Sequence, residues 1–286
     1  MSAYEEQLER FRQDPRSTAE LIALVLTKDA DADDNGYWHP VWILQQRMPG
    51  LFDRIRELAT SPEEKEREIA ATLLGQNGRP EKDRVMVEEC LDLLLLMLRQ
   101  ETSPTLLESI VYAIGHLHSP GRVETLATLA AHPNGDVRFA VVRSLCGSEE
   151  DLAIRTFIKL TTDPDSDVRD WATFSLGSQS DRDTPEIRDA LLARVNDTDD
   201  DTRCEAHVGL AQRGDPRLVA SFLHELNSTA TETLQDWSLV GETADFIADH
   251  ATRTDDLQWL PVLERLKILG LGDVTKVQAA LDHYRQ

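Results

Sequence analysis

Three copies of a seven-residue phrase stand at similar spacing in the middle of the chain. They occupy residues 132–138 (HPNGDVR), 163–169 (DPDSDVR) and 197–203 (DTDDDTR). Self-similarity at about 30 to 45 residues is typical of stacked helical units, because each unit is too small to bury its apolar face alone. The phrase therefore predicts an all-α fold, an α-solenoid built from antiparallel helix pairs.

Each phrase is followed by an apolar stripe at helical spacing. Counted from the Val or Thr of the phrase, apolar or small residues follow at positions four and eight, which places three side chains on one helical face. The residue at position nine is small, and the same frame extends upstream to Gly75 and Gly115. We expect Gly177, at position nine of its repeat, to end the helix by adopting a left-handed conformation.

The phrase has a physical explanation as a helix start. Asn134, Asp165 and Asp199 stand where an N-cap side chain accepts a hydrogen bond from a backbone N–H of the coming helix. Acidic residues of the first turn meet the positive end of the helix dipole. The arginines that end the phrases are expected to form a structural column that pairs with neighbouring acids: Arg138, Arg169 and Arg203.

The phrase at 163–169 and the sequence WATFSLG that follows at 171–177 together resemble HEAT repeats, specifically the phycobilisome-lyase-type repeats common in bacterial proteins. The resemblance covers about residues 49–226 and implies two antiparallel helices in each repeat. First helices are expected at 51–59, 87–98, 123–131, 152–160, 187–195 and 218–226. Adaptors, bilin lyases and hydroxylases share these repeats, so the resemblance implies a fold and no single activity.

We expect one continuous structural domain with a helical cap at each end. The N-terminal cap covers 1–48, and the C-terminal segment 227–286 contains a degenerate repeat followed by a helical cap, because exposed solenoid ends need capping. The repeats between them are predicted at 49–79, 80–120, 121–150, 151–181 and 182–226.

Charge restricts the classes of partner. The chain has 30 Lys and Arg against 52 Asp and Glu, a net charge of −22. A nucleic-acid binder needs concentrated basic residues, so the composition argues against that class and favours a basic protein partner reached by electrostatic steering. The alternative is that the acid serves solubility and helix capping alone. The absence of an 18-residue apolar run and the acidic N-terminus predict a cytoplasmic protein without membrane contact.

Motifs for metals or catalysis are incomplete. The segment 31–36 begins like a calcium loop, but Trp42 stands where the bidentate Glu belongs. His116 and His118 lack an identifiable third ligand, and Cys90, Cys146 and Cys204 are too far apart for a zinc or disulfide pattern. The hydroxylase branch implies several His-Glu pairs, whereas this chain has one, at 224–225. We therefore predict no catalytic, cofactor-binding or metal-binding residues and favour a non-enzymatic protein.

The remaining candidate is the outward face of the second helices, which usually lines the concave side of a HEAT solenoid. Positions two, five and six after the core residue of the phrase point away from the buried stripe. We predict that this face binds a basic protein and that the chain is a scaffold or adaptor, a monomer when free. An immunity or inhibitor protein is one version of this prediction. The alternative is a bilin lyase or isomerase. The residues are Glu68, Glu108, Tyr112, Phe139, Arg143, Asp170, Phe174, Cys204 and His207.

Overall fold

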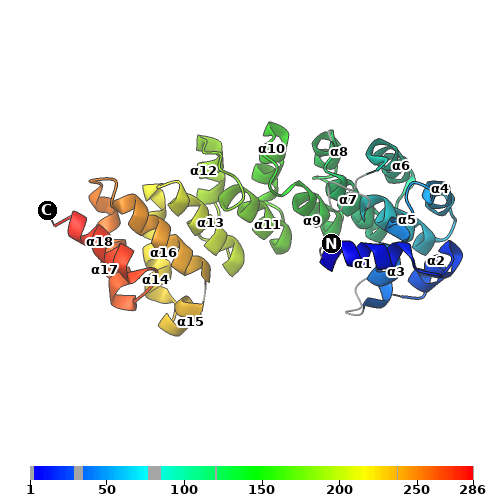
Figure 1. Ribbon diagram of the computed structural model, residues 1–286. Coiled ribbons are helices and arrows are strands. Elements are labelled where there is room, and N and C mark those ends of the chain that lie inside the picture. The colour runs from blue at the N-terminus through cyan, green and yellow to red at the C-terminus, as the bar shows by residue number, and fades with distance from the viewer. Residues whose placement is uncertain (1–2, 29–34, 77–84, 120, 237, 286) are drawn as a thin grey trace. The chain divides into compact units, whose positions relative to one another are not determined.

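The computed structural model describes residues 3–28, 35–76, 85–119, 121–236 and 238–285. Throughout these ranges the regular elements are helices joined by turns (Figure 1), which confirms the predicted all-α solenoid. The helices group into two compact units, residues 1–144 and 145–286.

In the first unit, a group of three N-terminal helices is followed by stacked helix pairs. The helices α2 and α3 pack against α5, the first helices α4 and α6 neighbour each other, and the second helices α5 and α7 neighbour each other. The bounds are α1 (Ala3–Arg12), α2 (Thr18–Leu26), α3 (Asn35–Gln45), α4 (Phe52–Ala59), α5 (Glu64–Gln76), α6 (Val87–Gln100), α7 (Pro104–Leu117), α8 (Arg122–Thr128) and α9 (Gly135–Leu145).

The second unit is also built from first and second helices in two layers. The second helices α11, α13, α16 and α18 are neighbours in that order, while α10 lies beside α12 and α14 beside α17. The boundary predicted at 226–227 falls inside α14, and the layering continues to the last helix. The bounds are α10 (Asp151–Leu160), α11 (Ser166–Gly177), α12 (Pro185–Leu192), α13 (Asp200–Gln212), η2 (Pro216–Leu218), α14 (Val219–Ser228), α15 (Thr231–Asp236), α16 (Ser238–Ala251), η3 (Leu257–Trp259), α17 (Leu260–Leu269) and α18 (Val274–His283).

The apolar stripe predicted from the phrase forms the core of each repeat. Its members are fully buried in all three copies, which confirms the helical frame used in the prediction. The stripe consists of Val137, Val141 and Leu145, then Val168, Ala172 and Leu176, then Thr202, Ala206 and Leu210.

Polar residues of the phrase cap the second helices as predicted. The Asp165 carboxylate accepts hydrogen bonds from the backbone N–H of Asp167 at 3.0 Å and of Val168 at 3.4 Å. The side chain of Asp199 accepts from the N–H of Thr202 at 2.8 Å. The third copy is similar, because Asn134 accepts through Oδ1 from Val137. The phrase therefore fixes where each second helix begins.

The arginine of the phrase joins its own repeat to the next one. Arg169 donates through Nη1 to the carbonyl oxygens of Asp163 and Pro164, at 2.9 and 3.2 Å. Its Nε and Nη2 donate to the two carboxylate oxygens of Asp197 at 3.2 and 3.0 Å. One guanidinium thus satisfies the loop that precedes its helix and holds an acid at the start of the following phrase.

This arrangement, which we call the arginine clamp, recurs along the chain. For Arg67, Arg138, Arg169 and Arg203, Nη1 donates to the carbonyl oxygen six residues upstream. A second nitrogen of Arg67, Arg169 and Arg203 binds an acid of the following repeat. The loop carbonyls are those of Ser61, His132, Asp163 and Asp197, and the acids paired with Arg67, Arg169 and Arg203 are Glu101, Asp197 and Glu225. Arg67 belongs to a repeat in which only the Pro and Arg of the phrase survive.

The negative charge of Asp197 is stabilised in spite of its burial. Burial, the largest influence, raises the pKa of Asp197, but the hydrogen bonds from Arg169 and from the N–H of Asp199, together with the charges of Arg169 and Arg194, hold that pKa below the usual range. The side chains of Arg169 and Asp197 are only 13% and 5% exposed, so solvent screens the pair weakly.

We expect Arg169→Ala to lower the free energy of unfolding by about 2 kcal/mol, because it removes two hydrogen bonds from the buried carboxylate of Asp197 and the donor from two loop carbonyls. The Asp197 carboxylate still accepts from Arg194 and from the N–H of Asp199. Arg54→Ala is the matched control, since Arg54 and Glu57 form an exposed pair on one helix, and such pairs contribute about 0–1 kcal/mol. Chemical denaturation of both variants makes the comparison. Equal losses would show that the clamp contributes no more than a surface ion pair.

Position nine of the repeat is small because neighbouring second helices touch there. A Cβ added to Gly75 would lie 2.5 Å from the Cα of Ala113, and one added to Gly115 would lie 2.5 Å from the Cβ of Ser144. Gly177 similarly faces Gly209 of α13. Each contact joins one second helix to the next.

Gly177 is the last residue of α11, so the helix ends there as predicted. The expected left-handed conformation is wrong, because the φ of Gly177 is not positive. Its lack of a side chain serves the contact with α13. The guanidinium of Arg213 closes this end of α11 by donating to the carbonyl oxygens of Leu176, Gly177 and Ser180 at 2.8 to 3.0 Å.

Gly209→Ala is expected to destabilise the protein by about 1–3 kcal/mol, although alanine favours helices, because the new Cβ would lie 2.6 Å from the Cα of Gly177. Gly241→Ala is the control of opposite sign. Gly241 lies in α16 with nothing within 4 Å of an added Cβ, so the substitution should stabilise by about 0.5–1 kcal/mol. Thermal unfolding measures both, and a gain from Gly209→Ala would refute the close approach.

Candidate functional site

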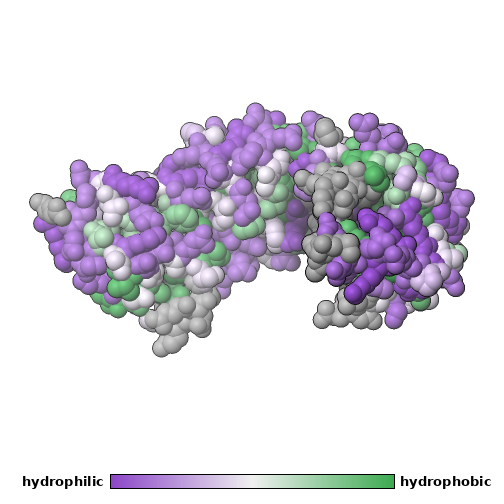
Figure 2. All heavy atoms as spheres, in the orientation of Figure 1, coloured by the Kyte–Doolittle hydropathy of each residue, from purple (hydrophilic) through white to green (hydrophobic). Residues whose placement is uncertain are grey.

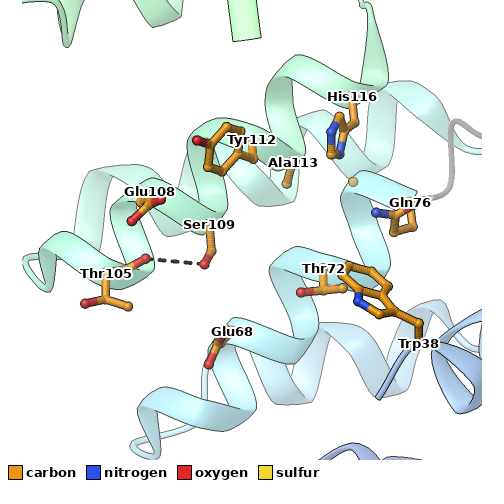
Figure 3. Close-up of a pocket in the computed structure, with 11 residues that line it drawn as sticks. Trp38, Glu68, Thr72, Gln76, Thr105, Glu108, Ser109, Tyr112, Ala113 and His116 are labelled. Atoms are coloured by element: carbon orange, nitrogen blue, oxygen red, sulfur yellow. Dashed lines mark hydrogen bonds between the residues drawn. The ribbon is translucent and has the colours of Figure 1, made fainter. Parts of the chain in front are cut away.

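Three of the predicted face residues line one groove of the first unit. Glu68 of α5 and Glu108 and Tyr112 of α7 border a space of about 280 Å³ between these helices. Figure 3 shows the side chains of α5 and α7 on opposite sides of the space, with Trp38 of α3 beside Gln76 at one end.

The packing of α5 on α7 explains why the groove exists. Gly75 and Ala113 are in direct contact, so the two backbones meet at small residues, and both of these residues also line the groove. Larger side chains before and after them, such as Glu68 and Tyr112, form its walls. The groove therefore depends on the small residue at position nine of the repeat.

The groove carries negative potential. Burial raises the pKa of the Tyr112 hydroxyl, the charge of Glu108 raises that pKa further, and Arg143 of α9 acts in the opposite direction. Arg143 also lies 6.0 Å from the ring centre of Phe139 on its own helix. Helix α9 follows α7, since Ser144 donates a hydrogen bond to the carbonyl oxygen of Val111. Five of the predicted residues therefore lie on α5, α7 and α9, the second-helix face of the first unit.

In the second unit, α11 presents a carboxyl group beside two aromatic rings. Asp170 and Phe174 are one helical turn apart, and the ring of Phe174 packs edge-on against Trp171 at 5.3 Å between centroids. All three side chains are partly exposed. Asp170 forms no hydrogen bond or ion pair with any other residue that the structure describes. We call the surface formed by Asp170, Trp171 and Phe174, together with Glu205 of α13, the α11 patch.

Two carboxyl groups of the α11 patch titrate close to neutral pH. Burial, aided by the charge of Glu205, raises the pKa of Asp170 to about 7. Burial also raises the pKa of Glu205 to about 6, although Ser178 donates a hydrogen bond to its carboxylate at 2.8 Å. A cation placed here would stabilise the ionised forms, so the patch is suited to a basic ligand.

His207 and Cys204 do not belong to an accessible face, contrary to the prediction. His207 is 2% exposed, its ring packs on Phe222 at 5.3 Å, and burial lowers its pKa to about 4. Cys204 is 6% exposed, and burial raises the pKa of its thiol to about 12. The prediction assumed one packed face per second helix, but α13 is enclosed by α11, α12, α16 and η2.

Two contributors to these surfaces were missed in the sequence. Trp38 was assigned to the N-terminal cap, and no local pattern indicates that α3 reaches α5. Glu205 stands at position three after the core Thr202, outside the positions selected by helical geometry. Both residues reach their sites through contacts between segments distant in sequence.

The motifs considered for metals add no site. Asp31, Asp33 and Asp34 of the calcium-like segment lie outside the described residues. His116 lines the α5–α7 groove, while His118 is the exposed, left-handed C-cap of α7. Within the described ranges no three His, Cys, Asp or Glu side chains gather as metal ligands would. None of the helices described here has the length and apolar character needed to cross a bilayer.

Asp170→Asn should make the protein more stable at pH 8 and leave it nearly unchanged at pH 4. The folded-state pKa of Asp170, about 7, lies above the unfolded value of 3.8, so ionisation costs stability as pH rises from about 4 to 7. We expect a difference of about 2 kcal/mol at pH 8, after allowing for the solvent that reaches the carboxyl group. Denaturation at both pH values tests this, and a pH-independent difference would contradict the raised pKa.

Comparison with known proteins gives a family match over the middle of the chain. Residues 91–177 and 154–239 match the model of a family described as HEAT repeats, and the two matches together cover more than half of the chain.

The proteins that resemble the chain include a curated relative and two solved structures. Protein YibA of Escherichia coli strain K12 is 26% identical over 170 residues, which are 59% of this chain and 56% of YibA, so the aligned part spans little more than half of that relative. The X-ray structure of Escherichia coli YibA has a TM-score of 0.69 at 23% identity and covers 100% of this chain and 98% of that one. The crystal structure of an engineered protein has a TM-score of 0.58 at 18% identity, covering 93% and 78%. At these identities the structures show a shared fold only.

Proposed function

The chain belongs to the HEAT-repeat family, and from this we propose that it is a non-enzymatic scaffold that binds a basic protein partner through its second-helix faces. The partner-binding residues of the proposal are Glu68, Glu108, Tyr112, Phe139 and Arg143 in the first unit and Asp170 and Phe174 in the second.

The observation that carries this proposal is the carboxyl group of Asp170. It is partly buried beside Trp171 and Phe174, and no cationic side chain of the described residues pairs with it. Removing a carboxylate from water costs free energy unless a cation or hydrogen-bond donor replaces the water. A Lys or Arg of a partner would supply that cation, and the two aromatic rings would supply contact area of the kind that interfaces favour.

Net charge supports the same partner class. In the view of Figure 2, hydrophilic residues cover most of the visible surface of both units, and the chain carries a net charge of −22. Such a field accelerates encounter with a positively charged protein and weakens with salt. An immunity or inhibitor protein that neutralises a basic toxin in the cytoplasm is one specific form of the proposal, with the free scaffold a monomer. The support for this immunity or inhibitor version is the net charge of the chain.

The alternative of a bilin lyase or isomerase requires a different kind of cavity from the α5–α7 groove. Sites for cofactor-sized molecules usually measure about 300–1,000 Å³ and are predominantly apolar. The α5–α7 groove measures about 280 Å³ and is bordered by Glu68, Glu108 and several hydroxyl groups. A purified protein that carries a bound pigment would favour the alternative.

The test begins with capture of the partner from lysate of the source organism, identification by mass spectrometry and purification of the captured protein. Its affinity is then measured by calorimetry with three proteins: wild type, Asp170→Asn and Glu264→Gln. Glu264 is an exposed acid on α17 and serves as the matched control. We expect Asp170→Asn to weaken binding about tenfold, because a hydrogen bond between charged groups contributes about 1.5–3 kcal/mol.

The control should bind like wild type, and raising the salt concentration should weaken all three complexes. An acidic partner, or equal affinities for Asp170→Asn and Glu264→Gln, would contradict the proposed function.

A further inference from the structure

The α5–α7 groove has the chemistry to receive one cationic side chain. We propose that it holds an arginine side chain of the protein partner, an inference that rests on the proposed function and names the residue that this site recognises. The site consists of Trp38, Glu68, Thr72, Glu108, Ser109 and Tyr112.

The two walls supply charge from opposite sides. Glu68 comes from α5 and Glu108 from α7, and Figure 3 shows both side chains bordering the same space. A guanidinium between them would meet a carboxylate on each side, whereas a phosphate or carboxylate ligand would be repelled by both. The charge of Glu108 already acts on Tyr112, since it adds to the rise of the Tyr112 pKa that burial causes.

The hydroxyl groups of the groove favour a ligand that carries hydrogen-bond donors and no acceptors. Ser109 uses its proton in a hydrogen bond to the carbonyl oxygen of Thr105 at 3.3 Å, so its oxygen is left to accept. The Thr72 hydroxyl shares a hydrogen bond of 3.2 Å with Tyr37 and keeps a lone pair. Guanidinium has five N–H donors and no acceptor, which matches a site of carboxylates and accepting hydroxyls.

The aromatic residues distinguish arginine from lysine. Trp38 and Tyr112 border the groove from α3 and α7, and a planar guanidinium stacks on aromatic faces while it binds carboxylates with its edge. An ammonium group is a compact charge that gains less from contact with an aromatic ring. The volume of about 280 Å³ suits a single long side chain and falls below the range of drug-sized ligands.

The probe for this site is N-acetyl-arginine amide, compared with N-acetyl-citrulline amide, which has nearly the same shape without the charge. The ¹⁵N resonance of the Trp38 indole, assigned with Trp38→Phe, reports binding to wild-type protein. We expect a saturable shift with the arginine probe and affinity about tenfold weaker for citrulline, because only guanidinium forms charge-assisted hydrogen bonds with the two glutamates.

The variant Glu68→Gln/Glu108→Gln should lose about tenfold in affinity for the arginine probe. Glu88→Gln/Glu89→Gln removes the same charge from the exposed face of α6 and should bind like wild type. Both variants should unfold at nearly the wild-type temperature. Equal binding of the two probes, or equal affinity in the two double variants, would overturn the proposal.

The captured partner separates this proposal from the function on which it rests. If Asp170→Asn weakens that complex and Glu68→Gln/Glu108→Gln does not, the protein is a binding scaffold and the arginine site is refuted. If no basic protein binds but the arginine probe does, the proposed function fails and the groove remains a guanidinium site. A dimer that Glu68→Gln/Glu108→Gln dissociates would assign the groove to a second copy and also overturn the proposal.

Discussion

The arginine clamp, which joins a repeat to the one that follows it, is the interaction on which the stack depends. A helix pair cannot bury its apolar face alone, so the repeats must be held in one register against each other. Arg169 does this with a single side chain, since it binds the loop before its own helix and the acid that opens the next phrase. The clamp is directional, and Arg67 in the first unit and Arg203 in the second each bind an acid of the following repeat in the same way.

Close contact between second helices follows from that register and creates the candidate sites. Where Gly75 meets Ala113, and Gly177 meets Gly209, the backbones approach and larger residues are pushed to the outer sides of the contact. In the first unit the displaced side chains border a groove. In the second unit the same kind of contact leaves Asp170 partly buried near Glu205. The negative potential of both surfaces is a consequence of helix packing as well as of composition.

Local signals in the sequence predicted the repeat, the buried stripe, the N-caps and the role of the phrase arginines, because each depends on residues within one turn or one repeat. The groove was predicted only in part: helical geometry selected Glu68, Glu108 and Tyr112, but Trp38 comes from α3 of the N-terminal helix group. The expected exposure of His207 and the expected left-handed conformation of Gly177 were wrong for a related reason. Gly177 faces Gly209 of the next second helix, and His207 packs on Phe222 of α14. Helical periodicity contains no information about which faces such neighbours cover.

The central claim is that the acidic residues of the second-helix faces contact the partner. Carbodiimide labelling of carboxyl groups in the wild-type protein tests this claim. The labelled sites are identified by mass spectrometry with and without the purified partner. The account predicts that Glu68, Glu108 and Asp170 lose reactivity in the complex, while Asp53 and Glu88 on first helices keep theirs. Protection of the first-helix carboxyls, with unchanged labelling of the other three, would contradict the account.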